Sequence, residues 1–133
     1  MNLDTGLLTV EQINLLLTHL PVDISFIDEN DKVAYYSNTE DRIFPRSPGI
    51  IGRSVQNCHP SRSVDMVNNI LDSFRDGTKS TAEFWIQLGG KFIHIRYFAL
   101  RDAEGTYKGC LEVSQDVTAI RGLEGDKRLL DWE

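Results

Sequence analysis

The sequence has few cysteines, no long apolar run and no basic cluster. Two cysteines among 133 residues, Cys58 and Cys110, are too few for a disulfide framework, which favours a reducing compartment such as the cytoplasm. No apolar run approaches the ~18 residues that a membrane-spanning helix needs, and the opening "MNLDTGLL" lacks the basic region of a signal peptide. These absences predict a cytoplasmic protein with no membrane partner.

The charge balance argues against nucleic acid as a partner. The chain has 14 basic and 20 acidic residues, a net charge of -6, and no polybasic run or RNA-binding signature. Because phosphate recognition depends on clustered Lys and Arg, neither nucleic acid nor an anionic membrane surface is expected to bind. The length and an apolar fraction of 41% fit one globular domain with its own core.

Two helices are predicted from apolar residues at helical spacing. Residues 9–20 form the first, with Thr9 as N-cap and Gln12 completing a capping box. Residues 60–74 form the second and stronger one, with Pro60 at its first position. The apolar face of this second helix is made by Val64, Val67, Leu71 and Phe74.

Five strands are predicted from β-rich and alternating runs. The first two, residues 24–28 and 33–37, form a hairpin around the turn "DENDK". After a loop at 38–54 with at most one or two helical turns and the second helix, three strands follow without interruption. They cover residues 81–88, 91–100 and 107–117, and "GG" at 89 and 90 joins the first two in a tight hairpin.

This order gives an α+β domain in which a five-stranded antiparallel sheet has helices on one face, beside an N-terminal helix. We assign residues 1–21 to the N-terminal helix, 22–118 to the main domain and 119–133 to a C-terminal tail. The strand 91–100 is apolar or aromatic on both sides. Helix 60–74 is therefore expected to cover one face, and the N-terminal helix, the tail or a second subunit the other.

Several segments resemble a PAS domain. The hairpin "ISFIDENDKVAYYSN" ends its strands in Asp and Asn as the family does, and "GIIGRSVQNCHP" resembles the segment before the family's main helix. The strand "YKGCLEVSQDVT" ends in Asp-hydrophobic-Thr, where PAS domains lead into a signalling helix. The run from Phe84 to Trp132 is most similar to the C-terminal PAS domain of DUF438 proteins, which often carry a hemerythrin-like domain upstream.

The resemblance covers residues 10–132 and implies a sensory or interaction module of bacterial signal transduction. PAS domains bind haem, flavin, small metabolites or nothing between sheet and helices, and they often form dimers. "NCHPSR" shares only its Asn-Cys with the flavin-adduct motif "NCRFLQ", so photoreception is not expected. The resemblance also implies an upstream domain in a longer chain.

Cys58 and His59 stand together just before the second helix. Adjacent side chains point in different directions, so the pair is poorly placed as nucleophile and base. No CxxC or HxxxH spacing indicates zinc, whereas haem needs only one axial ligand, such as His59 or His94. In a structural role, Ser61 or Ser63 would cap the helix and Cys58 would fill the core. In a functional role, the pair would border a pocket where helix N–H groups hold an anion.

We predict a ligand-binding set between helix 60–74 and the sheet. Its members are Cys58, His59, Met66, Ile70, Phe84, Ile95, Tyr97 and Val113. These side chains either line a cavity or fill it, and the sequence leaves both alternatives open. No catalytic residue and no metal ligand is predicted, and the cofactor, if any, is unknown.

Two further side chains bear on partners. Trp85 is expected on the outer face of the sheet as a packing or dimer contact. Arg96 is expected to pair with Glu83 or Glu112 across strands. The leading hypothesis is a non-enzymatic PAS sensor or interaction module that binds a small ligand and forms a homodimer. The alternatives are a dimerisation module with a filled core and a haem-linked redox or gas sensor.

Overall fold

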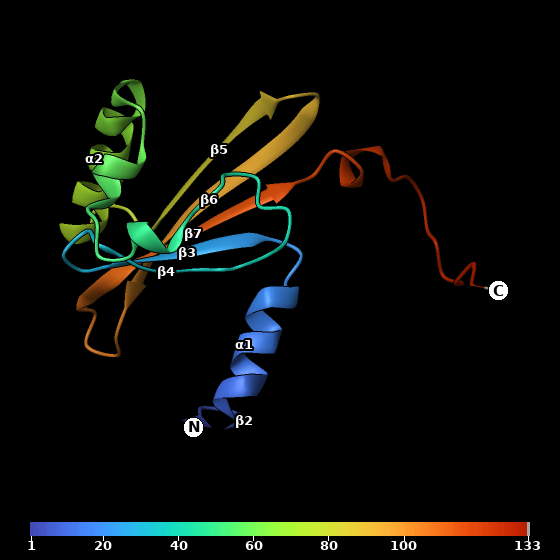
Figure 1. Ribbon diagram of the computed structural model, residues 1–133, viewed down its shortest axis with the longest axis horizontal. Coiled ribbons are helices and arrows are strands. Elements are labelled where there is room, and N and C mark those ends of the chain that lie inside the picture. Colours follow the sequence, from blue (N-terminus) through green and yellow to red (C-terminus); the bar gives the residue numbers. More distant parts are fainter. Residues whose placement is uncertain (133) are drawn as a thin grey trace.

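The computed structural model describes residues 1–132 and has a sheet with one helix packed on it and another leading away from it (Figure 1). The helices are α1 (Val10–His19) and α2 (Ser61–Arg75). The strands are β1 (Asn2–Leu3), β2 (Gly6–Leu7), β3 (Asp23–Asp28), β4 (Val33–Tyr36), β5 (Thr81–Leu88), β6 (Lys91–Arg101) and β7 (Tyr107–Asp116). Short 3₁₀ turns lie at Pro48–Ile50, Val55–Cys58 and Ile120–Gly122.

Five strands form one antiparallel sheet in the order β4-β3-β7-β6-β5. This confirms the predicted α+β class and the five-stranded antiparallel sheet. β7 lies in the middle, between β3 and β6, so its side chains lie at the centre of both faces. β1 and β2 pair separately in a short hairpin that the sequence did not predict.

The two-glycine turn between β5 and β6 has the predicted form. Gly89 and Gly90 have φ angles of 57° and 83°, and Leu88 faces Lys91 across the turn. Both angles lie in the left-handed region, which glycine adopts without steric cost. The turn fixes the register of the two strands, and this register decides which face each side chain takes.

Helix α1 begins as predicted but does not cover the sheet. The Thr9 hydroxyl accepts a bond from the Gln12 N–H at 3.0 Å, and the Gln12 side chain accepts from the Thr9 N–H at 2.9 Å. The helix then leads away from the sheet (Figure 1), and none of its residues is buried. Of the three covers proposed for the outer face, α1 is therefore excluded within this chain.

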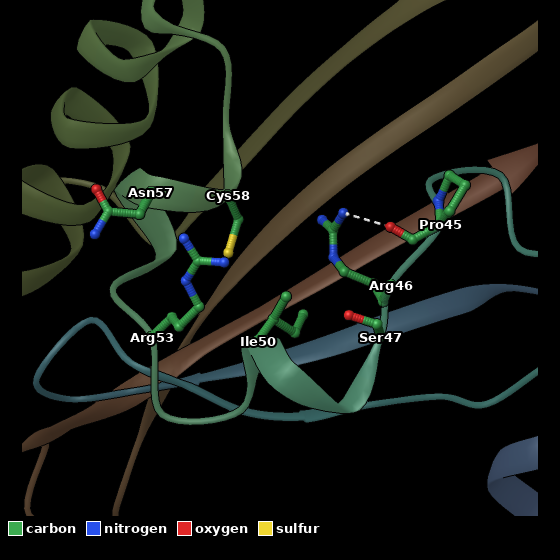
Figure 2. A pocket seen from close by; sticks show the side chains of 7 residues that line it. All are labelled: Pro45, Arg46, Ser47, Ile50, Arg53, Asn57 and Cys58. Atoms are coloured by element: carbon green, nitrogen blue, oxygen red, sulfur yellow. Dashed lines mark hydrogen bonds between the residues drawn. The ribbon is translucent and has the colours of Figure 1, made fainter.

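A buried carboxylate helps to fasten the first part of the loop between β4 and α2 to the sheet. Asp23 on β3 accepts the Ile43 N–H at 2.6 Å and the Thr39 hydroxyl at 2.7 Å. Beyond this anchor, the loop passes over the sheet and surrounds a hollow of about 340 Å³ (Figure 2). Arg46 and Arg53 extend into this region from different parts of the loop, with Cys58 between them (Figure 2).

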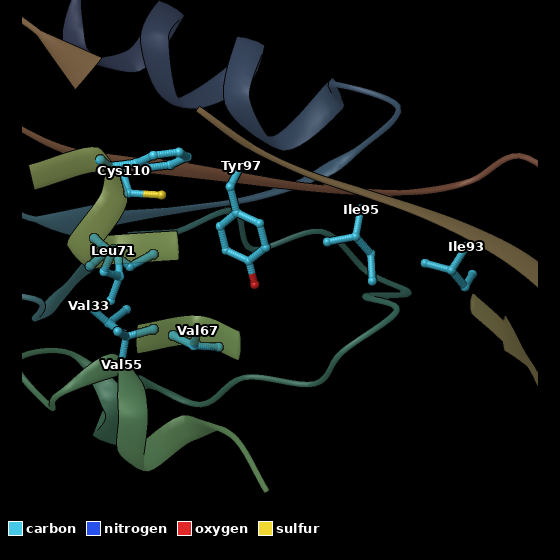
Figure 3. Close-up of a cluster of buried hydrophobic side chains, with 10 residues drawn as sticks. Val33, Val55, Val67, Leu71, Ile93, Ile95, Tyr97 and Cys110 are labelled. Carbon is cyan, nitrogen blue, oxygen red and sulfur yellow. The ribbon is translucent and has the colours of Figure 1, made fainter. Parts of the chain in front are cut away.

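The core lies between α2 and the face of the sheet that α2 covers, here called the inner face. Val67, Leu71 and Phe74 are the buried residues of α2. Tyr97 points from β6 toward the α2 side chains, and Ile95 and Ile93 point to the same side farther along the strand (Figure 3). Fully burying one such side chain stabilises the fold by about 1.5–3 kcal/mol, so this contact fixes α2 on the sheet.

Arg101 ties the C-terminal end of α2 to β6. Its guanidinium donates to the carbonyl oxygens of Phe74 at 2.8 Å and Lys79 at 3.0 Å, and to the Ser80 hydroxyl at 2.7 Å. The last carbonyls of a helix lack partners within the helix, and a cation there also opposes the helix dipole. One side chain therefore holds this end of α2.

The end of β7 is locked to β6 by Thr118. The Thr118 hydroxyl accepts the Phe92 N–H at 2.8 Å and donates to Asp116 at 2.5 Å, while the Val117 N–H bonds to the Phe92 carbonyl at 2.9 Å. The Asp-Val-Thr motif thus extends the pairing of β7 to the point where the tail leaves. Beyond it, Arg121 lies 3.8 Å above the Phe92 ring, the tail's cation–π contact with the sheet.

Candidate functional site

A cleft of about 360 Å³ opens between the start of α2, the loop before it and the inner face of the sheet. Its apolar wall is made by Phe44, Pro60, Met66, Phe84, Ile86 and Ile95. Its polar and titratable residues are Arg46, Cys58, His59, Arg62, Ser63, Tyr97 and Glu112. Arg46 and Cys58 also line the hollow in Figure 2, so these two side chains separate the two spaces.

The cleft has a buried inner end and an open mouth. Ile95, Tyr97 and Glu112 are only 3–6% exposed and form the inner end on β6 and β7. Met66 is 41% exposed and Arg62 is exposed, so they mark the mouth on α2. The rings of Phe84 and Tyr97 stack with centroids 5.9 Å apart, which gives the wall a flat aromatic section.

The structure brings together most of the side chains predicted to bind a ligand. The cleft is lined by Cys58, His59, Met66, Phe84, Ile95 and Tyr97. Ile70 is partly buried and packs against the hydrophobic core instead of lining the cleft.

The placement of Val113 in the pocket was wrong. Val113 pairs with Arg96 on β6 and Ile24 on β3, and all three lie on the outer face of the sheet. Its neighbour Glu112 pairs with Tyr97, and it is Glu112 that reaches the cleft. Apolar character suggested the inner face for Val113, but here the centre of β7 presents its polar side chains inward.

Glu112 is the functional candidate that residue type alone missed. The signal was available in the pleat: Glu112 shares a face with Cys110 and Ser114, and Cys110 is fully buried in the core. Burial raises the pKa of the Glu112 carboxyl, while Arg46 and Arg42 counteract part of this rise.

The pKa values of two other cleft residues, Tyr97 and His59, are also shifted by burial and by neighbouring charges. Burial, and next the nearby Glu112 carboxyl, raise the pKa of the Tyr97 hydroxyl, so Tyr97 stays protonated. Burial, with Arg46 as the second cause, lowers the pKa of His59, which favours its neutral form. The His59 Nε2 atom is covered by protein and finds no hydrogen-bond partner within residues 1–132.

The Cys58–His59 pair has none of the contacts of a catalytic dyad. The Cys58 thiol lies 3.8 Å from the Ser54 carbonyl oxygen, its sole hydrogen-bond contact among the residues described. The predicted serine caps are also wrong, because no side chain caps α2 and the Ser63 hydroxyl donates instead to the Pro60 carbonyl at 3.0 Å. Pro60 itself precedes the helix as its N-cap residue.

The outer face of the sheet has a different character. Trp85 is 59% exposed there, as expected, and sits opposite His94, whose ring lies 2.6 Å from Glu83. Glu83 faces Arg96 across the strands but pairs with His94, and Glu112 lies on the other face. Neither predicted Arg96 ion pair is present in the described structure; its guanidinium lies 5.8 Å from the Phe98 ring.

Residues 1–132 contain neither a cluster of metal-ligating side chains nor a membrane-spanning helix. No three His, Cys, Asp or Glu side chains in this range come together as a group that could hold a metal ion. No helix in the same range has the length and apolar character needed to cross a membrane.

Comparison with known proteins gives consistent matches. A family profile described as PAS domain matches residues 13–118, and no curated protein matches the sequence. A C-terminal domain from Streptococcus mutans is 35% identical, with a TM-score of 0.87 over 93% of this chain and 96% of that one.

Two more distant structures share the fold. A sensory box sensor histidine kinase from Vibrio cholerae is 14% identical, with a TM-score of 0.59 over 80% of this chain and 89% of that one. The PAS domain of BvgS from Bordetella pertussis is 15% identical, with a TM-score of 0.61 over 82% and 86%.

Proposed function

Because this chain belongs to the PAS domain family, we propose that it is a sensory module of signal transduction that binds a small molecule between α2 and the sheet. The observation that carries the proposal is the cleft itself. It combines an apolar wall with a buried carboxyl and a buried hydroxyl at its inner end, Glu112 and Tyr97. An apolar pocket with a few convergent polar groups is the usual form of a small-molecule site.

The position of Glu112 connects the cleft with the end of the domain. Glu112 lies on β7, which ends at Asp116. Directly after it come Thr118, whose side chain bonds to Phe92 and Asp116, and the tail. A ligand shifts a conformational equilibrium only by its differential affinity for the two states. If β7 has two conformations and a ligand contacts Glu112 more favourably in one of them, ligand binding would favour that conformation. The position of the first tail residues after Thr118 would change with it.

The test is to identify what the protein retains. Native mass spectrometry of the freshly purified protein, followed by analysis of the small molecules released on denaturation, should reveal one bound compound in stoichiometric amount. The same compound, added back to stripped protein, should raise the melting temperature. A protein that retains nothing, and whose melting temperature no compound of a metabolite library raises, would contradict ligand sensing.

We also propose that the module forms a homodimer, and exposed apolar side chains favour this second role. On α1, Val10, Leu15 and Leu16 are 71%, 51% and 55% exposed. On the outer face, Trp85 adds a large exposed aromatic surface. Large exposed apolar side chains often mark a protein–protein contact. Residues 119–132 of the tail are exposed throughout, so a second subunit is the cover of the outer face that remains.

The haem-linked alternative has less support. His59 lines the cleft, but its Nε2 atom is covered, and His94 lies on the outer face in contact with Glu83. The His59 Nε2 atom and the whole His94 side chain would have to move before they could ligate iron in the cleft. The small-molecule sensor needs no such rearrangement.

We further propose a bacterial, cytoplasmic setting in which this domain follows others in a longer chain, as in the DUF438 proteins that it resembles. The similar Streptococcus mutans structure is described as a C-terminal domain, which supports this arrangement. The module would then receive its signal in the cleft and act on its neighbours without catalysing a reaction itself.

A further inference from the structure

The charges around the cleft do not balance. The chain as a whole has six more acidic than basic residues, yet Arg46 and Arg62 both line the cleft and neither forms an ion pair within the described residues 1–132. The Arg46 side chain makes a single hydrogen bond in that range, from Nη1 to the Pro45 carbonyl at 3.3 Å. A guanidinium has five N–H donors, so most of those on Arg46 are available.

The one acid of the cleft is poorly suited to neutralise these cations. Glu112 is 6% exposed and is surrounded by Tyr97, Cys110 and Ser25 on the neighbouring positions of the sheet. No salt bridge joins it to either cleft arginine in the part of the chain that the structure describes. An anion from outside the protein is therefore the missing partner.

We propose that the cleft selects a small carboxylate with an apolar body, whose anionic group is held by Arg46 and whose body lies against Phe84 and Ile95. This inference rests on the proposed ligand-binding function and specifies its ligand class. A guanidinium matches the planar geometry of a carboxylate and binds it through two parallel N–H groups. The stacked rings of Phe84 and Tyr97 provide a flat apolar surface beside it.

Glu112 determines when this anion binds well. Arg46 lines the cleft together with Glu112, Tyr97 and His59, and its positive charge opposes part of the rise that burial causes in the pKa of Glu112. An ionised Glu112 would compete with the ligand for Arg46 and repel it, whereas a protonated Glu112 and the Tyr97 hydroxyl are hydrogen-bond donors. Arg42, the other cation that acts on Glu112, donates to the Ser37 carbonyl at 2.7 Å and is already engaged.

The test compares two compounds that differ in charge but hardly in shape, 2-naphthoate and 2-naphthamide. Isothermal titration on protein stripped of retained molecules should show naphthoate binding at least about tenfold more tightly, the effect of one charge-assisted hydrogen bond. Arg46→Gln should remove this preference and leave naphthamide binding unchanged. Glu112→Gln should preserve it and reduce the loss of naphthoate affinity at high pH.

Arg53→Gln is the matched control. Arg53 lines the neighbouring hollow and not the cleft, so the variant should bind both compounds like the wild type. Equal binding of both compounds to the wild type would overturn the carboxylate inference and leave the sensor proposal standing. Binding of neither compound to the folded protein would overturn the carboxylate inference, whereas the sensor proposal is decided by the native mass spectrometry and the metabolite library. Equal losses in Arg46→Gln and Arg53→Gln would mean that general charge, and not the cleft, governs affinity.

Discussion

Glu112 is the buried carboxyl group of the cleft. Its carboxyl is nearly fully buried at the centre of the sheet, beside the Tyr97 hydroxyl and within the influence of Arg46 and Arg42. Burial disfavours the charged form, and the two arginines offset this only in part, so the pKa of the folded protein is raised. The folded state therefore holds this proton more firmly than the unfolded chain does.

This shift makes stability depend on pH in a defined direction. Above the ordinary pKa of 4.5 the unfolded chain releases the proton while the folded state still holds it, so stability falls as pH rises through the folded pKa. Glu112→Gln should therefore be more stable than the wild type at pH 8, and the difference should vanish below pH 4.5. Urea denaturation across this range measures it.

Glu104→Gln is the control, because Glu104 is exposed in the turn before β7 and its replacement should leave the pH profile unchanged. A Glu112→Gln variant less stable than the wild type at pH 8 would mean that attraction to the arginines outweighs the cost of burial.

At this scale the sequence predicted positions better than roles. Cys58, His59 and Tyr97 were expected beside one another and line one cleft. Arg46 was missed because it lies in a loop, where no periodicity indicates which way a side chain points. Val113 was misplaced because the assignment followed apolar character, whereas in an antiparallel sheet the pairing register decides the face.

Among the elements, α2 packs into the core at its C-terminal end and borders the cleft at its N-terminal end. Phe74, near its C-terminal end, is 1% exposed and packs into the core, while Met66, near its N-terminal end, is 41% exposed at the mouth of the cleft. Phe74→Ala should lower the free energy of unfolding by about 3–5 kcal/mol, as expected for a buried aromatic side chain.

Met66→Ala is the matched variant on the same helix. It should lower the free energy of unfolding by less than about 1 kcal/mol, because the side chain is largely outside the core, and it should weaken binding of an apolar ligand. Chemical denaturation and titration of both variants measure the two effects. Similar losses of stability would show that the cleft end of α2 is as tightly packed as the core end.

Elements were the scale at which sequence patterns worked best. The capping box at Thr9 and the two-glycine turn each depend on local chemistry, and both were confirmed. The β1–β2 hairpin escaped prediction because two-residue strands are too short for any alternation. The direction taken by α1 depends on contacts with distant parts of the chain. The spacing of apolar residues predicts the helix itself but not where it packs.

For the whole molecule, the main question is what covers the outer face of the sheet. If a second copy does so with the help of α1, sedimentation equilibrium should show a monomer–dimer equilibrium that depends on concentration. Leu16→Glu places a charge on the exposed apolar side of α1 and should weaken the dimer at least about tenfold. Its melting temperature at low concentration should stay near that of the wild type, because Leu16 lies outside the core.

Asn69→Glu adds the same charge on an exposed position of α2 and should leave the dimer intact. A wild-type protein that remains monomeric at millimolar concentration would overturn the homodimer proposal.

The bonds that Arg101 makes to the end of α2 have a mechanical consequence. The helix is clamped to β6 at its C-terminus, while its first turn has no side-chain cap. We therefore expect the first turn of α2, near Pro60, to be displaced more easily than the C-terminal end near Phe74. A ligand that enters the cleft beneath this first turn would tilt α2 relative to the sheet. The Arg101 hydrogen bonds would pass that displacement to β6, the strand next to β7.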